Sequence, residues 1–194
     1  MANTTLTDLP ENTNPDLTDL LYSVVDVTGT PDSKKLTLAN LKMLMAPDYI
    51  CIQDQKAQNT NGGTFTSGDW RTRDLNVEQS DSGGHASVAS NQITLAAGTY
   101  ICSARAPAAA CEHQVARLYN VTDAAVILSG TSRYLSTGDT ALGVSEIHGK
   151  FTIAASKVIE VQHYCSQTRN TNGFGVASNL AVEIYTVIEL WKVA

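Results

Sequence analysis

Short runs in which apolar and polar residues alternate fill the chain from Tyr49 to its end, and Gly, Asn and Pro separate them. Successive side chains of a strand point to opposite faces, so these runs predict β-strands. Many short strands with turn residues between them favour an all-β fold. The sequence therefore predicts a β-sandwich of the jelly-roll kind over residues 47–194, called the head domain below.

The strand expected over residues 182–193 is apolar on both faces. One face carries Val182, Ile184, Thr186, Ile188 and Leu190, and is expected to point into the core. The other carries Glu183, Tyr185, Val187, Glu189, Trp191 and Val193. So much apolar surface is rarely left in water, which indicates a subunit interface there. The alternative is that another sheet or loop of the same chain covers it.

Tyr49 and Cys51 join this interface if the first and last strands of the head domain pair. Arg71 and Arg73 share one face of a further strand. Guanidinium groups suit carboxylates at interfaces, so cross-subunit pairs with Glu183 or Glu189 are one expectation for these arginines. Solvated surface charge is the other.

Residues 1–46, called the N-terminal segment below, have a different pattern. Residues 6–16 are polar and broken by prolines, so they are expected to be extended or irregular. A strand is expected near 21–27, and a short helix over 38–45, capped by Thr37. So few apolar residues cannot form a core, so the segment is predicted to dock on another surface. The residues predicted to attach it are Leu6, Leu9, Leu21, Tyr22, Val24, Val25, Leu38 and Leu41.

The composition of the chain argues against nucleic acid and membranes as partners. The formal net charge is −6, and no cluster of Lys and Arg suggests a nucleic-acid partner. No secretory signal and no long apolar run is seen, so neither export by that route nor membrane insertion is expected.

Cysteine and histidine residues could take part in catalysis or bind a metal, but none of them lies in a known sequence motif for either role. The four cysteines lack a C-x-x-C pair and are expected to be buried thiols, with a Cys102–Cys165 bridge as the alternative if their strands are neighbours. Histidines 85, 113, 148 and 163 have no local catalytic or metal-binding signature. No catalytic residue, metal or other cofactor is predicted.

An ordered set of segments resembles the jelly-roll domains of the complement-head and tumour-necrosis-factor type, in the form found in virion proteins of tailed bacteriophages. The segments are 53–57 (QDQKA), 63–65 (GTF), 70–76 (WRTRDLN), 97–100 (AGTY), 113–120 (HQVARLYN), 149–151 (GKF), 173–175 (GFG) and 188–193 (IELWKV). The N-terminal segment is similar to the leader of phage fibre and head-appendage proteins, through 6–10 (LTDLP), 26–30 (DVTGT) and 35–41 (KLTLANL).

The resemblance implies a homotrimer whose N-termini attach to the capsid or another virion protein and whose heads face outward. Animal members often bind calcium near the trimer axis. This sequence has no dense acidic loop that matches such a site, so calcium is not expected here.

The resulting hypothesis is a non-enzymatic virion protein: a trimeric head fibre or capsid decoration made in the host cytoplasm. The host contact would be a surface polysaccharide or protein, with Phe65, Tyr134 and Phe174 as expected receptor contacts in or near loops. A tail-fibre or baseplate receptor-binding protein is the main alternative. A carbohydrate-active enzyme is a remote one, because it would need paired carboxylates.

Overall fold

A computed structural model gives the structure of the chain and describes residues 20–25, 32–37, 47–138 and 142–193. The chain forms two compact units, Met1–Ala46 and Pro47–Ala194. Among the described residues there is no helix that is long and apolar enough to cross a membrane.

The N-terminal unit contains a two-stranded antiparallel sheet. Strand β1 (Leu20–Val25) pairs with β2 (Asp32–Thr37). The strand expected near 21–27 is confirmed as β1, and it contains Leu21, Tyr22, Val24 and Val25. Strand β2 was not predicted, because its polar start reads as a turn. The helix expected over 38–45 and the attachment residues Leu6, Leu9, Leu38 and Leu41 lie outside the described residues.

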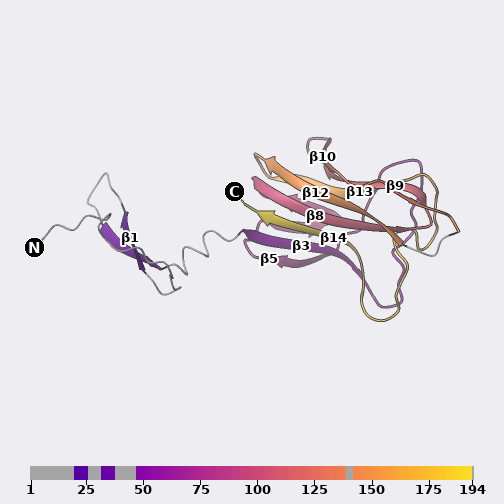
Figure 1. Ribbon diagram of the computed structural model, residues 1–194, viewed down its shortest axis with the longest axis horizontal. Helices are drawn as coiled ribbons and strands as arrows, with labels where there is room; N and C mark the ends of the chain where they lie inside the picture. The colour runs from indigo at the N-terminus through magenta and orange to yellow at the C-terminus, as the bar shows by residue number, and fades with distance from the viewer. Residues whose placement is uncertain (1–19, 26–31, 38–46, 139–141, 194) are drawn as a thin grey trace, which may run out of the picture. The chain divides into compact units, whose positions relative to one another are not determined.

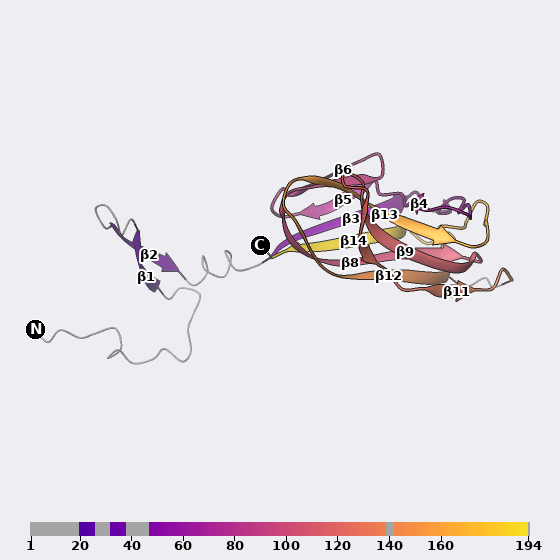
Figure 2. The same ribbon diagram turned by 90° about the horizontal axis from the view of Figure 1, so that it is seen from above.

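The first sheet of the head domain has five antiparallel strands (Figure 1). Their order is β12 (Leu142–Ile153), β8 (Gly98–Ala109), β14 (Glu183–Lys192), β3 (Asp48–Lys56) and β5 (Val77–Asp81). The first and last strands of the head domain are therefore neighbours, with Trp191 opposite Tyr49 and Lys192 opposite Asp48. Figures 1 and 2 show the end of β14 beside the start of β3.

The second sheet is built around β9 and β13. Its order is β10 (Ala125–Ser129), β9 (Glu112–Asn120), β13 (Lys157–Cys165), β7 (Gln92–Leu95) and β6 (Ala86–Ala89). Two short strands join it from the side: β11 (Arg133–Leu135) pairs with β9, and β4 (Arg71–Thr72) pairs with β13. The expected all-β sandwich of two antiparallel sheets is confirmed.

The core lies between the two sheets and follows the alternation of their strands. Ile188 and Leu190 of β14 are fully buried, as are Ile50 and Ile52 of the neighbouring β3. The second sheet contributes apolar residues of β7, β9 and β13 to the same cluster. Burial of these residues supplies the main driving force for folding of the head domain.

A β-bulge reverses the alternation in the first part of β14. The register with β3 shifts between Ile184 and Val187. An extra residue in one strand turns the following side chains to the other face. Ile184 is therefore half exposed and Tyr185 is buried, the opposite of what strict alternation predicts. The prediction of Val182 and Ile184 in the core is wrong for this reason.

Arg73 is buried inside the head domain rather than placed on its surface. Its Nε donates to Thr186 Oγ1 at 2.7 Å, and its terminal nitrogens donate to the carbonyl oxygens of Pro107 at 3.0 Å and Phe174 at 2.9 Å. Burial lowers the pKa of its guanidinium to about 10, so it stays charged at neutral pH. Because the side chain has no exposed surface, the expectations of a subunit contact and of solvated charge are both wrong for Arg73.

Replacing Arg73 should destabilise the head domain. Arg73→Met leaves three buried oxygens without their donor, so we expect a loss of about 3–5 kcal/mol in the free energy of unfolding. Urea unfolding at fixed subunit concentration measures this loss, with Arg133→Met, at an exposed arginine, as the control. Equal midpoints for the two variants would contradict the structural role.

Candidate subunit interface

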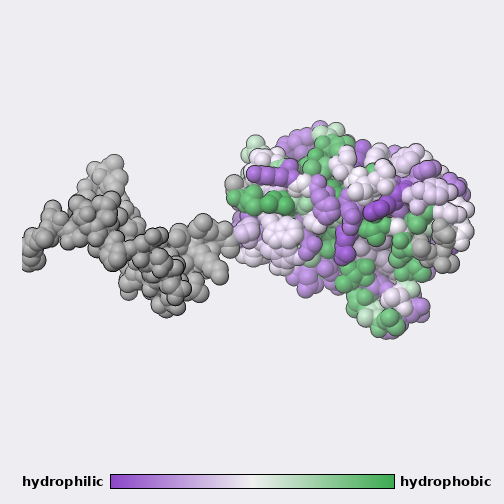
Figure 3. Space-filling view, viewed as in Figure 1, coloured by the Kyte–Doolittle hydropathy of each residue, from purple (hydrophilic) through white to green (hydrophobic). Residues whose placement is uncertain are grey.

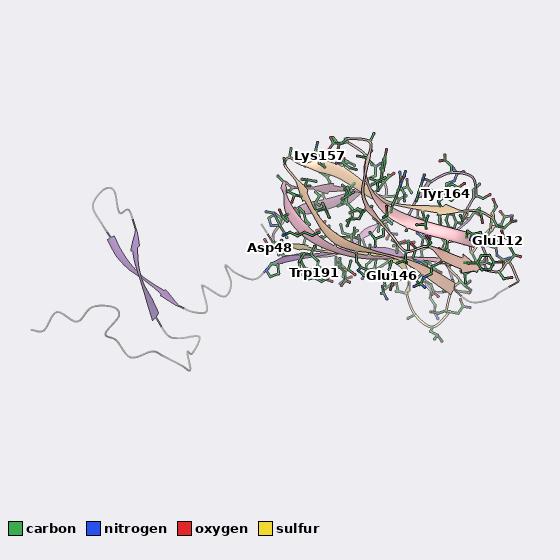
Figure 4. All side chains as sticks on the ribbon, turned by 45° about the horizontal axis from the view of Figure 1, so that its top comes forward. Asp48, Glu112, Glu146, Lys157, Tyr164 and Trp191 are labelled. Atoms are coloured by element: carbon green, nitrogen blue, oxygen red, sulfur yellow. The ribbon has the colours of Figure 1, made fainter. Side chains whose placement is uncertain are left out.

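The outer face of the five-stranded sheet begins with an apolar row at the end where β3 starts. The register places Ile101 of β8, Trp191 of β14 and Tyr49 of β3 side by side. The rings of Tyr49 and Trp191 are 5.4 Å apart, and Figure 4 shows Trp191 close to Asp48. Ile101 is 44% exposed. Paired aromatic and aliphatic groups open to solvent are typical of interface cores.

Polar residues form the next row across the same face. His148, Ser103, Glu189 and Cys51 lie opposite one another on β12, β8, β14 and β3. The hydroxyl of Tyr49 donates to Glu189 Oε1 at 2.7 Å. Burial, followed by this carboxylate, raises the pKa of Tyr49. Tyr49 therefore stays protonated and orients the Glu189 side chain on the open face.

A third row continues the face and contains a free cation. Glu146, Arg105, Val187 and Gln53 are its members. Among the described residues Arg105 makes no ion pair within the chain. Arg105 lines two hollows, one of about 440 Å³ that also contains Tyr49 in its lining and one of about 340 Å³ that contains Leu142. A charged group in the lining of two open hollows is well placed to meet a carboxylate of another molecule.

The second hollow is bordered by apolar side chains that are open to solvent. Leu142, Val182 and Ile184 are each about half exposed, and the neighbouring Leu180 is 86% exposed. Figure 3 shows this face, with hydrophobic patches over the sheet and on the loop that leads into β14. Exposed apolar patches of this kind mark sites of association.

Five of the predicted interface residues lie together on this face: Tyr49, Cys51, Val187, Glu189 and Trp191. Their role in assembly stays a prediction. Tyr185 is largely buried, packs on Gly175, where a Cβ would collide with its ring, and donates from its hydroxyl to Thr60 O at 2.7 Å. It borders both hollows but is mainly a core residue.

Glu183 and Arg71 do not belong to this surface. The Glu183 carboxylate accepts hydrogen bonds from the backbone N–H groups of Asn59, Ser178 and Asn179. Arg71 lies on β4, in the other sheet, and its Nε donates to Thr66 O at 3.2 Å. The expected ion pairs between these arginines and Glu183 are therefore wrong.

Two of the three expected receptor contacts are also wrong. Phe65 and Phe174 are buried and their rings pack together at 4.5 Å, because turn-like sequence around them folds back onto the core. Tyr134 is 61% exposed and stays a candidate.

The cysteines and the buried histidine offer no reactive site. All four cysteines are free and buried, as the favoured interpretation expected. Cys102 and Cys165 lie in different sheets and separate clusters, and burial raises the pKa of each thiol to about 12. Burial, aided by Arg73, holds the pKa of His163 well below its usual value, so the ring is neutral. In the described part of the chain, no three metal-ligating side chains are grouped to hold an ion.

Sequence reasoning missed Ile101, Arg105 and Leu142. Their contribution depends on which strands neighbour β14, and strand order is not visible in one sequence. The only signal was the apolar Tyr100-Ile101-Cys102 run, which puts an apolar residue on each face of β8.

Comparisons with known proteins identify the fold. No protein-family model matches the sequence, and no curated protein matches it. The head domain has a jelly-roll fold, as the resemblance implied. The structure is similar to murine APRIL at pH 5.0, with a TM-score of 0.50 and 9% identity over 75% of this chain and 98% of that one. It is also similar to the globular domain of zebrafish complement 1qA, with a TM-score of 0.48 and 12% identity over 77% and 98% of the two chains.

Glu183 should make the loop before β14 sensitive to acid. Hydrogen bonds from Ser178, Asn179 and Asn59 lower the pKa of Glu183 below its ordinary value. The stabilisation is therefore complete above the ordinary carboxylate pKa and is lost as the pH falls through the lowered pKa. Glu183→Gln should lower the melting temperature at pH 7 and reduce its fall in acid. Glu78→Gln, at an exposed position, is the control, and an unchanged acid profile would count against this role.

Proposed function

We propose that the chain is a homotrimeric structural protein of a tailed-phage virion, in which the N-terminal segment attaches to the particle and the head domain faces outward. The observation that carries the proposed assembly is the open face of the five-stranded sheet, with Ile101, Trp191 and Tyr49 in one row. A second and a third copy of the head domain are its proposed occupants.

The chemistry of the face supports contact between like copies. Its apolar ends flank two polar rows, which carry Arg105 as well as Glu146 and Glu189. Opposite charges on one surface allow each copy to offer a cation to one neighbour and a carboxylate to the other, as cyclic assembly requires. The resemblance to complement-head and tumour-necrosis-factor domains supports three copies rather than two.

The virion role rests on the N-terminal segment. It resembles a phage leader, and residues 1–46 form a unit distinct from the head domain. We propose that this unit docks on the capsid or on another virion protein. Three heads held on one particle would convert weak single contacts with a host into avidity.

The enzymatic alternative has little support in the geometry. Hydrolysis of a glycosidic bond needs two carboxylates that flank one cleft. Each hollow on the five-stranded sheet has one carboxylate in its lining, Glu189 in one and Glu183 in the other. Both are already bonded within the chain.

The proposed trimer predicts different masses for two variants that each place an arginine on an exposed apolar position. Ile101→Arg places a charge in the proposed interface and should convert a species of three times 20.7 kDa to monomer at about micromolar concentration. Val126→Arg is the control, because Val126 is 48% exposed on β10 of the other sheet. Light scattering after gel filtration measures both masses. A wild-type monomer, or an unchanged mass for Ile101→Arg, would overturn the proposed assembly.

Location on the particle separates the head-fibre proposal from the tail-fibre rival. Antibodies raised against the head domain should decorate the capsid in electron micrographs of intact virions. Labelling confined to the tail tip or baseplate would favour the receptor-binding alternative, and absence from virions would remove the virion role altogether.

A further inference from the structure

The outer face of the second sheet carries an aromatic surface that the proposed trimer does not use. The Tyr164 and Trp70 rings are 5.7 Å apart, and those of Tyr134 and His113 are 4.9 Å apart. The Arg117 guanidinium lies 3.8 Å above the Trp70 ring and 4.7 Å from the Tyr119 ring. We call these six residues the aromatic strip. All six have partly or largely exposed side chains.

Strand register makes the strip continuous. Tyr134 of β11 lies opposite His113 of β9, and along β9 the residues facing outward continue through Arg117 to Tyr119. The six residue-to-residue steps from His113 to Tyr119 span about 20 Å, which is the length of a short chain segment rather than of a single small molecule. Figure 4 shows Tyr164 at the end of the head domain away from Trp191 and Asp48. The strip belongs to the second sheet, whereas the apolar row of the proposed interface lies on the five-stranded sheet.

A row of planar polar groups runs beside the rings. Arg117 Nε donates to Gln162 Oε1 at 2.7 Å, and Gln162 Nε2 donates to a Glu160 oxygen. Gln92 Nε2 donates to the other Glu160 oxygen at 3.0 Å. These bonds fix the side chains in place before any ligand arrives, which reduces the entropy lost on binding.

One end of the strip is a hollow of about 190 Å³ with a positive lining. Its walls are His113, Gln114, Val115, Ser132, Arg133 and Tyr164. None of them is acidic, in a chain whose net charge is −6. Arg133 is half exposed, and its nearest carboxylate, that of Glu146, is 3.9 Å away at the limit of an ion pair. Its Nε donates to Val144 O at 3.0 Å, so the two terminal nitrogens are the groups left to bind a carboxylate of another molecule, with two parallel hydrogen bonds.

We propose that the aromatic strip binds a segment of an acidic polysaccharide. Sugar rings have apolar C–H faces that pack on aromatic rings, and their hydroxyl groups pair with planar amide, carboxylate and guanidinium groups. The strip offers aromatic rings and the Arg117 guanidinium, and the Gln162 amide lies beside them, held in place by the buried Glu160. A uronic-acid carboxylate of the same polysaccharide is assigned to Arg133 in the positive hollow.

This inference gives a chemistry to the host contact in the proposed function and rests on it in that respect. The site itself is complete within one subunit, so it can be tested separately from assembly. A substitution that leaves the protein trimeric but abolishes polysaccharide binding acts on the aromatic strip alone. A substitution that makes the protein monomeric but leaves polysaccharide binding intact acts on the subunit interface alone.

Affinity electrophoresis of the full chain in native gels tests the proposal, with polygalacturonate as the acidic probe and dextran as the neutral one. We expect polygalacturonate to retard the protein, and Trp70→Ala and Arg133→Gln each to weaken the retardation about tenfold, since each removes about 1.4 kcal/mol or more of contact. Arg169→Gln, at an exposed arginine in the loop after β13, is the matched control and should bind normally.

Three results would overturn the proposal. The first is no retardation by polygalacturonate. The second is equal retardation by dextran, which would remove the role of Arg133. The third is tighter binding of a single-stranded oligothymidylate than of polygalacturonate, since nucleic-acid bases also stack on aromatic rings. Light scattering of each variant checks its assembly, and its melting temperature checks its fold.

Discussion

Both faces of strand β14 carry apolar side chains that need to be shielded from water, and the rest of the head domain is arranged around this strand. Ile188 and Leu190 point into the core, while Val187 and Trp191 point the other way, so two apolar surfaces share one central strand. The second sheet covers the inner surface. Among the described residues no element of the head domain covers the row of Ile101, Trp191 and Tyr49, which is why that face defines the proposed assembly.

The two outer faces of the sandwich differ in chemistry, and this difference supports two roles. The five-stranded sheet presents apolar ends with charges of both signs between them, a pattern suited to copies of itself. The second sheet presents rings beside fixed planar polar groups, a pattern suited to a hydroxyl-rich ligand. One fold can hold both because each outer face is free of the packing requirements of the core.

Much of the fold was predictable because alternation is a local property. The all-β class and the inner positions of Ile188 and Leu190 follow from runs of a few residues. The pairing of the strands that contain Tyr49 and Trp191 is a feature of the resembled jelly-roll fold and does not follow from such runs. The errors came where tertiary contacts override the local pattern. A bulge exchanged the faces of Ile184 and Tyr185. Arg73 is buried because it donates hydrogen bonds to three oxygens that are far from it in the sequence. Phe65 and Phe174 looked like loop residues, yet they form part of a buried cluster.

The placement of β3 beside β14 has a mechanical consequence. Strand β3, which begins at Asp48, hydrogen-bonds with β14 on one side and β5 on the other, so a pull directed along its axis acts on both ladders. Ladder bonds between antiparallel strands are perpendicular to the strands, so such a force loads them together in shear instead of opening them one at a time. A pull along β3 therefore has to break the ladder bonds of two neighbouring strands together before the start of the head domain opens.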